Sequence, residues 1–153
     1  MTATPTRCTE QTGQDWLLSC TTRPTDVCRQ WDDEELAPFR TGAHWLAAEA
    51  ALLQSMHAMK RMGGKCLGPV LADAEANLAW WLLPASVGDE LDGIRTLTVH
   101  PAGWVLRCPP VLHPVGVRMW LERPDWSGRL TDPTLLGAAF SPGGARLSVE
   151  ASG

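Results

Sequence analysis

The residues of this chain that could do covalent chemistry lie on either side of a proline-rich corner. Cys108 stands directly before Pro109 and Pro110, and histidines occupy positions 100 and 113. A thiol becomes a nucleophile when a base lies beside it in space, so Cys108 with His100 or His113 is one candidate site. A buried cysteine with a structural role is the more common use of such a position. We therefore predict no catalytic residue and keep a small Cys/His enzyme using Cys108 as an alternative.

Carboxylates offer a second kind of chemistry, the binding of metal ions. Asp32–Glu35 is a contiguous acidic run, and contiguous residues of a helix point in different directions, so the run is typical of a solvated surface. A second group of carboxylates lies in predicted loops: Asp73, Glu75, Asp89, Glu90 and Asp92. These side chains could hold two metal ions only if the loops brought them together. Their spacing fixes no such geometry. We predict no metal site and no cofactor.

The same corner is a better candidate for binding than for catalysis. Residues 97–120 have the pattern of two apolar strands joined by a turn at Pro101–Gly103, followed by the stiff pair Pro109–Pro110. If the strands pair as a hairpin, cationic or titratable groups gather on one side of the sheet between two indole rings: His100, Arg107, His113, Arg118, Trp80 and Trp120. Such a site suits a planar anionic ligand or an acidic peptide. In the alternative interpretation both tryptophans belong to the core and the arginines lie on its rim.

The composition bounds the class of protein and its partners. The 153 residues carry a net charge of −4 without a basic stripe, so nucleic-acid binding should be weak at best. The five cysteines form no CxxC pair, and the N-terminal sequence lacks the apolar stretch of a signal peptide. No apolar run is long enough to span a membrane. These features predict a cytoplasmic protein with reduced thiols and no membrane partner, and they leave the oligomeric state open.

Periodicity and turn residues predict an α+β fold, with an antiparallel-rich sheet of about five strands packed with three or four helices. Helices are expected at 15–20, 26–36, 49–62 and 133–140, and Thr131 or Asp132 should cap the last of them. Strands are expected at 44–48, 68–71, 78–84, 97–100, 104–106 and 118–121, and those at 68–71 and 78–84 should form a hairpin around residues 73–77. One stripe of the helix at 49–62 should face the core: Leu52, Leu53, Met56, Met59 and Met62. Residues 25–140 should form a single domain, between a loose or briefly helical segment at 1–24 and a flexible tail at 141–153.

The stretch PPVLHPVGVRMW after Cys108 resembles part of the N-terminal catalytic domain of bifunctional DNA primase/polymerases, of the archaeo-eukaryotic primase type. The matching positions are Pro109, Pro110, His113, Pro114, Gly116 and Trp120. Four further segments are similar to short actinobacterial proteins described in the same way: residues 40–45, 67–70, 80–84 and 130–133. The resemblance implies an α+β scaffold of the primase/polymerase kind.

The catalytic positions of that family are not retained in this chain. Thr98 stands where the resemblance implies the third acidic residue, and Leu78 where it implies a histidine that contacts the incoming nucleotide. Only Glu49 is a candidate for the first acidic pair. The resemblance therefore implies a degenerate domain, and we expect a non-catalytic, cytoplasmic binding or regulatory module whose partner is another protein or a small anionic ligand. The alternatives are an active primase/polymerase-type nucleotidyltransferase and the Cys108 enzyme.

Overall fold

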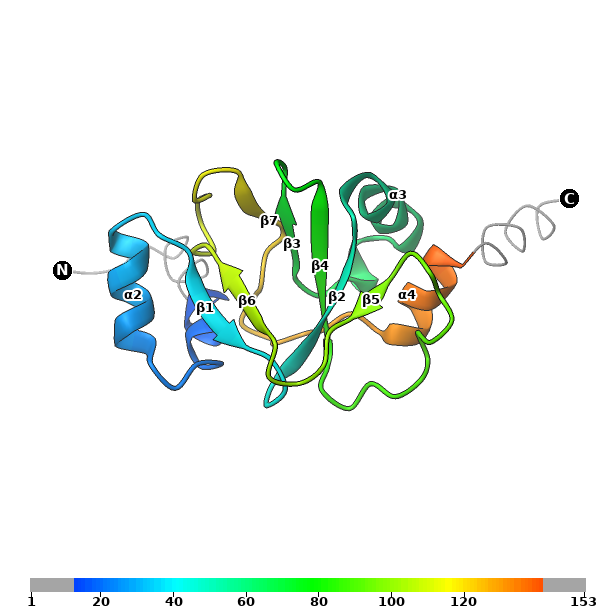
Figure 1. Ribbon diagram of the computed structural model, residues 1–153, viewed down its shortest axis with the longest axis horizontal. Coiled ribbons are helices and arrows are strands. Elements are labelled where there is room, and N and C mark those ends of the chain that lie inside the picture. Colours follow the sequence, from blue (N-terminus) through cyan, green and yellow to red (C-terminus); the bar gives the residue numbers. More distant parts are fainter. Residues whose placement is uncertain (1–12, 142–153) are drawn as a thin grey trace, which may run out of the picture.

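The computed structural model describes residues 13–141, and a five-stranded antiparallel sheet lies in the middle of the molecule (Figure 1). Its strand order is β5-β2-β4-β3-β7, and β1 and β6 form a separate two-stranded antiparallel sheet. The strands are β1 (Ala37–Arg40), β2 (Trp45–Ala51), β3 (Val70–Asp73), β4 (Leu78–Pro84), β5 (Thr98–Val99), β6 (Val105–Cys108) and β7 (Arg118–Glu122). The helices are α2 (Pro24–Asp32), α3 (Leu52–Met62) and α4 (Pro133–Phe140), with a 3-10 turn η1 (Gly64–Cys66) and a further helical segment at 13–18. This architecture confirms the predicted α+β class.

One face of the five-stranded sheet packs against α3 and α4 (Figure 1). Trp81 of β4 is fully buried there and meets Phe140 of α4 edge to face, with ring centroids 5.8 Å apart. The Trp81 indole also donates a hydrogen bond of 3.1 Å to Ser55 Oγ of α3. Ser55 and Ala58 are the buried residues of α3, so small side chains let this helix lie close to the sheet.

The opposite face carries a second core, covered by the small sheet and α2. The large sheet contributes five buried side chains to it: Trp45, Leu71, Trp80, Leu82 and Trp120. Trp31 of α2 stacks on Phe39 of β1 with centroids 6.1 Å apart, and it donates a hydrogen bond of 2.9 Å to the Cys108 carbonyl oxygen. Leu17, from the helical segment before α2, is buried in the same cluster. Glu49 of β2, on this face, keeps 28% of its side chain exposed, so part of the face is open to solvent.

Strand β2 is longer than predicted and takes the first residues of the helix expected at 49–62. Residues 49–51 pair in register with β4, and Glu49 also pairs with Thr98 of β5. Pairing along both edges of β2 outweighs the helix propensity of glutamate and alanine. The helix therefore begins only at Leu52.

The apolar stripe predicted for this helix is wrong in part. Leu53 and Met56 are 61% and 46% exposed, whereas Leu52, Met59 and Met62 pack against the core. The helix is rotated from the expected orientation because Ser55 and Ala58 face the sheet. Small residues at a contact allow closer approach than the methionines would.

The hairpin predicted for residues 97–106 does not form, and that prediction is wrong. β5 pairs with β2 of the large sheet, whereas β6 pairs with β1. The turn at Pro101–Gly103 is present, with a hydrogen bond of 3.1 Å from the Trp104 N–H to the Pro101 carbonyl oxygen, but it carries the chain from one sheet to the other. The sequence does not predict β1, because the strand contains Pro38. Proline is tolerated there since both strands of a two-stranded sheet are edges.

Several other predicted elements are confirmed. β3 and β4 form the expected hairpin, β7 is present, and α4 begins after Asp132, whose side chain accepts a hydrogen bond of 2.8 Å from the Thr134 N–H. Helix α2 begins earlier than predicted, at Pro24, and ends before Glu34, whose φ of 59° lies in the left-handed region. The terminal predictions for residues 1–12 and 142–153 lie outside the described residues.

Candidate functional site

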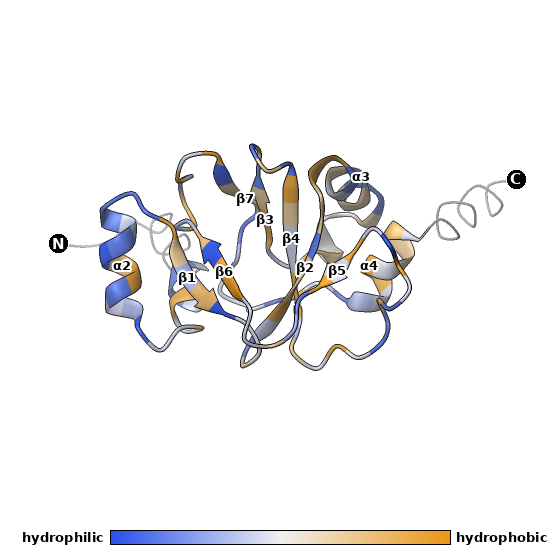
Figure 2. Cartoon of the chain, viewed as in Figure 1, coloured by the Kyte–Doolittle hydropathy of each residue, from blue (hydrophilic) through white to orange (hydrophobic). Residues whose placement is uncertain are grey.

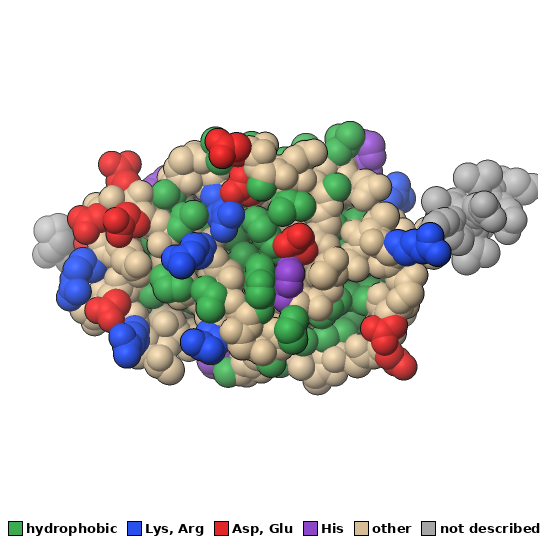
Figure 3. Space-filling view, in the orientation of Figure 1, with side chains coloured by type: hydrophobic (Ala, Val, Ile, Leu, Met, Phe, Trp, Pro, Cys, Tyr) green, Lys and Arg blue, Asp and Glu red, His purple; other side chains and the backbone are tan. Residues whose placement is uncertain are grey.

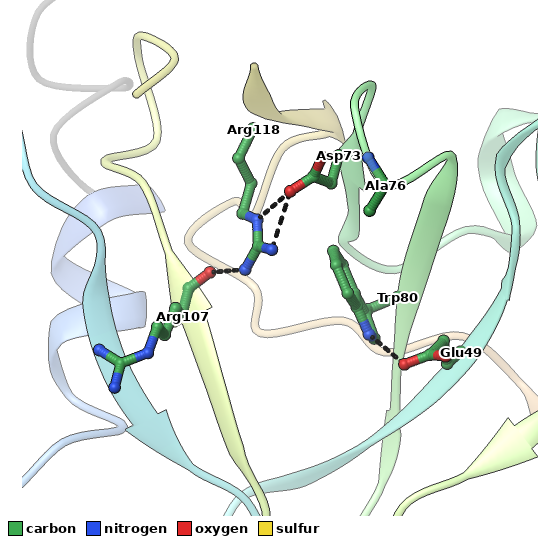
Figure 4. A network of polar contacts seen from close by, with 6 residues as sticks. All are labelled: Glu49, Asp73, Ala76, Trp80, Arg107 and Arg118. Carbon is green, nitrogen blue, oxygen red and sulfur yellow. Dashed lines mark hydrogen bonds and ion pairs between the residues drawn. The ribbon is translucent and has the colours of Figure 1, made fainter. Parts of the chain in front are cut away.

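A largely enclosed ion pair on the same sheet face as Glu49 links β3, β6 and β7 (Figure 4). Asp73 Oδ2 accepts hydrogen bonds from Arg118 Nε and Nη2 at 3.1 and 2.9 Å. Arg118 Nη1 donates to the Arg107 carbonyl oxygen at 2.9 Å, and its Cζ lies 4.5 Å from the centroid of the Trp80 ring. The guanidinium is therefore held by a carboxylate, a carbonyl oxygen and an indole face together.

Asp73 also closes the turn that joins β3 to β4. Its Oδ1 accepts a hydrogen bond of 2.8 Å from the Ala76 N–H. That bond, together with the Arg118 guanidinium, lowers the pKa of the Asp73 carboxyl against the opposing effect of burial. Both oxygens of this carboxylate therefore have partners inside the protein.

Glu49 of β2 is the centre of a second polar group. Its Oε1 accepts a hydrogen bond of 3.0 Å from Trp80 Nε1 and lies 3.0 Å from His100 Nε2. The His100 ring stacks on Trp104, with centroids 3.8 Å apart and planes 3° from parallel. One oxygen of the Glu49 carboxylate is thus shared by an indole and an imidazole, and the imidazole is itself held by stacking on Trp104.

The two carboxylates of this face do not converge. Glu49 and Asp73 lie on strands separated by β4 and are offset by two residues along the sheet, which puts their Cα atoms about 12 Å apart. Trp80 lies between them (Figure 4). On β5 the residue opposite Glu49 is Thr98, which offers only a hydroxyl. Among residues 13–141, no three side chains of His, Cys, Asp or Glu lie close enough together to hold a metal ion.

The six residues predicted to form a binding site are only partly brought together. Trp80 and Arg118 are in contact, but Arg107 meets Arg118 only through its carbonyl oxygen. The Arg107 side chain points away from both (Figure 4). The predicted gathering of cations on one side of the sheet fails because β5 and β6 belong to different sheets.

The other residues predicted to bind a ligand are either buried in the core or lie away from Arg118. Trp80 and Trp120 are 4% and 5% exposed, so they belong to the core, as in the alternative interpretation. The Trp120 indole donates a hydrogen bond of 3.1 Å to the Pro109 carbonyl oxygen, which ties the proline corner to β7. His100 lies with Glu49 and away from this corner, and His113 is exposed in the loop before β7.

Cys108, the candidate nucleophile, is fully buried. Its Sγ lies 3.7 Å from the Leu106 carbonyl oxygen, and burial raises the pKa of the thiol far above its ordinary value. The reactive form of a cysteine is the thiolate, which this environment disfavours.

A groove that the sequence does not reveal lies over α2 and the small sheet. Its volume is about 1150 Å³, and its walls come from residues 19–30, 38–44 and 102–105. Among the described residues, the charged side chains that line it are three arginines, Arg23, Arg29 and Arg40, and one carboxylate, Asp26. His44 is also part of the lining. We call this feature the arginine groove. Figure 3 shows Lys and Arg side chains over α2, β1 and β6, with Asp and Glu side chains among them at the α2 end, and α2 is hydrophilic over most of its length (Figure 2).

The protein holds these arginines only loosely. Arg23 and Arg29 lie 3.9 and 3.5 Å from oxygens of the same carboxylate, Asp26, and their side chains are 80% and 68% exposed. Such surface pairs contribute little to stability. Arg40 is exposed at the end of β1. No sequence signal could have grouped the three, because they come from the residue before α2, the last turn of that helix and a strand of the small sheet.

Two places on the described surface are therefore candidate sites: the Glu49–Asp73 face of the large sheet and the arginine groove.

No helix within residues 13–141 combines the length and the apolar character needed to cross a membrane. The chain matches no protein-family model, no curated protein and no solved structure.

Proposed function

We propose that this chain is a non-catalytic, primase/polymerase-like binding module that holds an anionic partner in the arginine groove. The groove itself carries the proposal, because three arginines face one carboxylate there in a chain whose net charge is −4. Guanidinium groups form strong, charge-assisted hydrogen bonds to carboxylates and phosphates. Arg23 and Arg29 share a single exposed carboxylate, so turning toward an external anion costs them little.

The polar groups of the large sheet support the absence of catalysis. Two-metal phosphoryl transfer needs carboxylates that converge on ions about 4 Å apart. Here Asp73 is engaged by Arg118, and Glu49 by the Trp80 indole. The resemblance implies a third acidic residue at position 98, directly opposite Glu49 in the sheet, where this chain has Thr98. This register supports a scaffold that keeps the family's arrangement of strands and has lost its metal ligands.

The two alternative functions have less support. An active nucleotidyltransferase would have to release Asp73 from Arg118 before the carboxylate could bind a metal ion. The Cys108 enzyme would need a thiol that a substrate can reach, and this one is buried. The described cysteines are all free thiols, Cys20, Cys28, Cys66 and Cys108, which supports the proposed cytoplasmic location.

Nucleotide incorporation by the purified full chain tests the proposal. Template-dependent and template-independent extension should be measured with Mg²⁺ and with Mn²⁺, and we expect no extension in either case. Extension that is lost in Glu49→Gln or Asp73→Asn, and kept in Glu35→Gln at an exposed position after α2, would show an active nucleotidyltransferase and overturn the proposal.

A further inference from the structure

We infer that the arginine groove binds an acidic peptide segment of a partner protein; this inference rests on the binding function proposed above. The outward face of the small sheet forms part of the groove. Pro38 pairs with Arg107 and Arg40 with Val105, and directly opposed residues share a face. All four side chains are exposed. This face therefore presents two cations and two apolar side chains in diagonal alternation. Three of them, Pro38, Arg40 and Val105, line the groove, and Arg107 lies outside its lining.

The spacing of these side chains suits an extended peptide. Pro38 and Arg40 are two residues apart on one strand, which is the interval at which an extended chain repeats its side chains on one side. An acidic residue over Arg40 and an apolar residue over Pro38 would follow from the same peptide register. Val105 of β6, opposite Arg40, is the second exposed apolar side chain that lines the groove.

The shape and lining of the groove fit a small anionic ligand less well. Its volume of about 1150 Å³ exceeds the roughly 300–1,000 Å³ typical of small-molecule pockets. Arg23 and Arg29 meet at the Asp26 carboxylate, whereas Arg40 lies on β1, so the three arginines come from two separate parts of the groove wall. Among the described residues that line the groove there is no tryptophan or phenylalanine, so a nucleotide base has no large ring to stack on.

A nucleic acid fits poorly because α2 ends in an acidic run. Asp32–Glu35 is exposed throughout and would repel a backbone of continuous negative charge that followed the helix. A short acidic peptide can end before it. Residues 1–12 contain one acidic and one basic residue, as do residues 142–153, so neither segment carries an excess of negative charge for the groove. This balance favours a segment of another protein as the occupant.

Fluorescence anisotropy with the full chain tests this inference. The probe is a short fluorescein-labelled peptide of alternating Glu and Ala, and its matched control has Gln in place of every Glu. We expect the Glu peptide to bind and the Gln peptide not to bind. Arg40→Ala should weaken binding about tenfold, the scale of one charge-assisted hydrogen bond. Arg95→Ala, which removes an exposed arginine outside the groove, should leave binding unchanged, and both variants should melt like the parent chain.

The other outcomes separate this inference from the proposed function. Equal binding of the Glu and Gln peptides, or full binding by Arg40→Ala, overturns the acidic-peptide inference. Tighter binding of single-stranded DNA or ATP that depends on Arg40 also overturns it but leaves the binding function standing. Self-association that Arg40→Ala abolishes, measured by analytical ultracentrifugation, would identify the acidic run Asp32–Glu35 of a second copy as the occupant and overturn it as well. Nucleotide incorporation alone would refute the non-catalytic function.

Discussion

Removal of the Asp73 carboxylate should destabilise the fold more than any other single loss of charge on the open sheet face. Asp73→Ala leaves the Arg118 guanidinium without its carboxylate and removes the acceptor of the Ala76 N–H. Arg118 would keep the Arg107 carbonyl oxygen and the face of Trp80. The change therefore breaks one half of a largely enclosed ion pair and one turn hydrogen bond.

The expected loss follows from the burial of the pair. Leaving one charge of a buried pair without its partner costs about 3–5 kcal/mol, and a turn hydrogen bond contributes about 1 kcal/mol. Because the Arg118 and Asp73 side chains keep 17% and 13% exposure, solvent reduces the first figure, and we expect a total of about 3 kcal/mol. For a chain of this length that lowers the melting temperature by about 6–12 °C.

Urea unfolding followed by tryptophan fluorescence measures this free energy. The control is Glu75→Ala, an exposed residue of the same turn, which should change stability little. The pKa of Asp73 is lowered in the folded chain, so its contribution is present above its unfolded pKa of about 3.9 and is lost as the pH falls through the folded value. The difference between the parent chain and Asp73→Ala should therefore shrink below about pH 4. A loss under about 1 kcal/mol at pH 7, or a difference that does not change with pH, would refute this reasoning.

Three further predictions concern packing, titration and reactivity. Gly68→Ala should lower the free energy of unfolding in urea by roughly 3 kcal/mol, because a Cβ at position 68 would lie 2.5 Å from Leu130 Cα. In the control Gly64→Ala the new Cβ has no atom within 4 Å, so stability should hardly change. Burial raises the pKa of Glu122, and nearby Arg129 partly offsets this increase. The ionised Glu122 carboxylate therefore destabilises the fold at neutral pH, and this cost disappears as the pH falls. Glu122→Gln should raise the melting temperature at pH 7 and leave it unchanged near pH 4; a lower value at pH 7 would contradict this. Cys108 should react with a thiol reagent only after unfolding, and modification of the native chain at this residue, detected by mass spectrometry, would contradict its burial.

Elements defined by local sequence could be predicted well. The apolar runs around the turn at 73–77 predict the β3–β4 hairpin, and Asp132 before Pro133 predicts the start of α4. Both signals act between neighbours in the chain, through turn formation and helix capping. The fold class follows from the order of such elements.

The choice of strand partners could not be predicted in the same way. β5 and β6 follow one another across a short turn, yet each pairs with a strand more than 40 residues earlier. Helix propensity favoured a helix at Glu49, but pairing with Trp80 and Thr98 fixed it in a strand. The pattern of apolar and polar residues indicates which side of a strand or helix is buried. It carries little information on which distant strand that element pairs with.

The candidate site was misplaced for the same reason. A hairpin of residues 97–106 would have put His100 beside Arg107. Because the hairpin does not form, His100 lies beside Glu49 and Arg107 belongs to the small sheet. The arginine groove depends on α2 lying against β1, a contact between elements that no local motif encodes. Arg40 is part of a segment that the sequence singled out only for its resemblance.

The most direct test of the claim that the Glu49–Asp73 face holds no catalytic metal is a Mn²⁺ titration followed by the indole N–H signals in an NMR spectrum. The Trp80 indole donates to Glu49 Oε1, so a paramagnetic ion bound by that carboxylate would broaden its signal first. Trp126, which is 73% exposed, serves as the reference for nonspecific broadening. We predict that the Trp80 signal broadens no sooner than that of Trp126. Selective loss of the Trp80 signal, abolished by Glu49→Gln, would contradict the claim and identify a working metal centre.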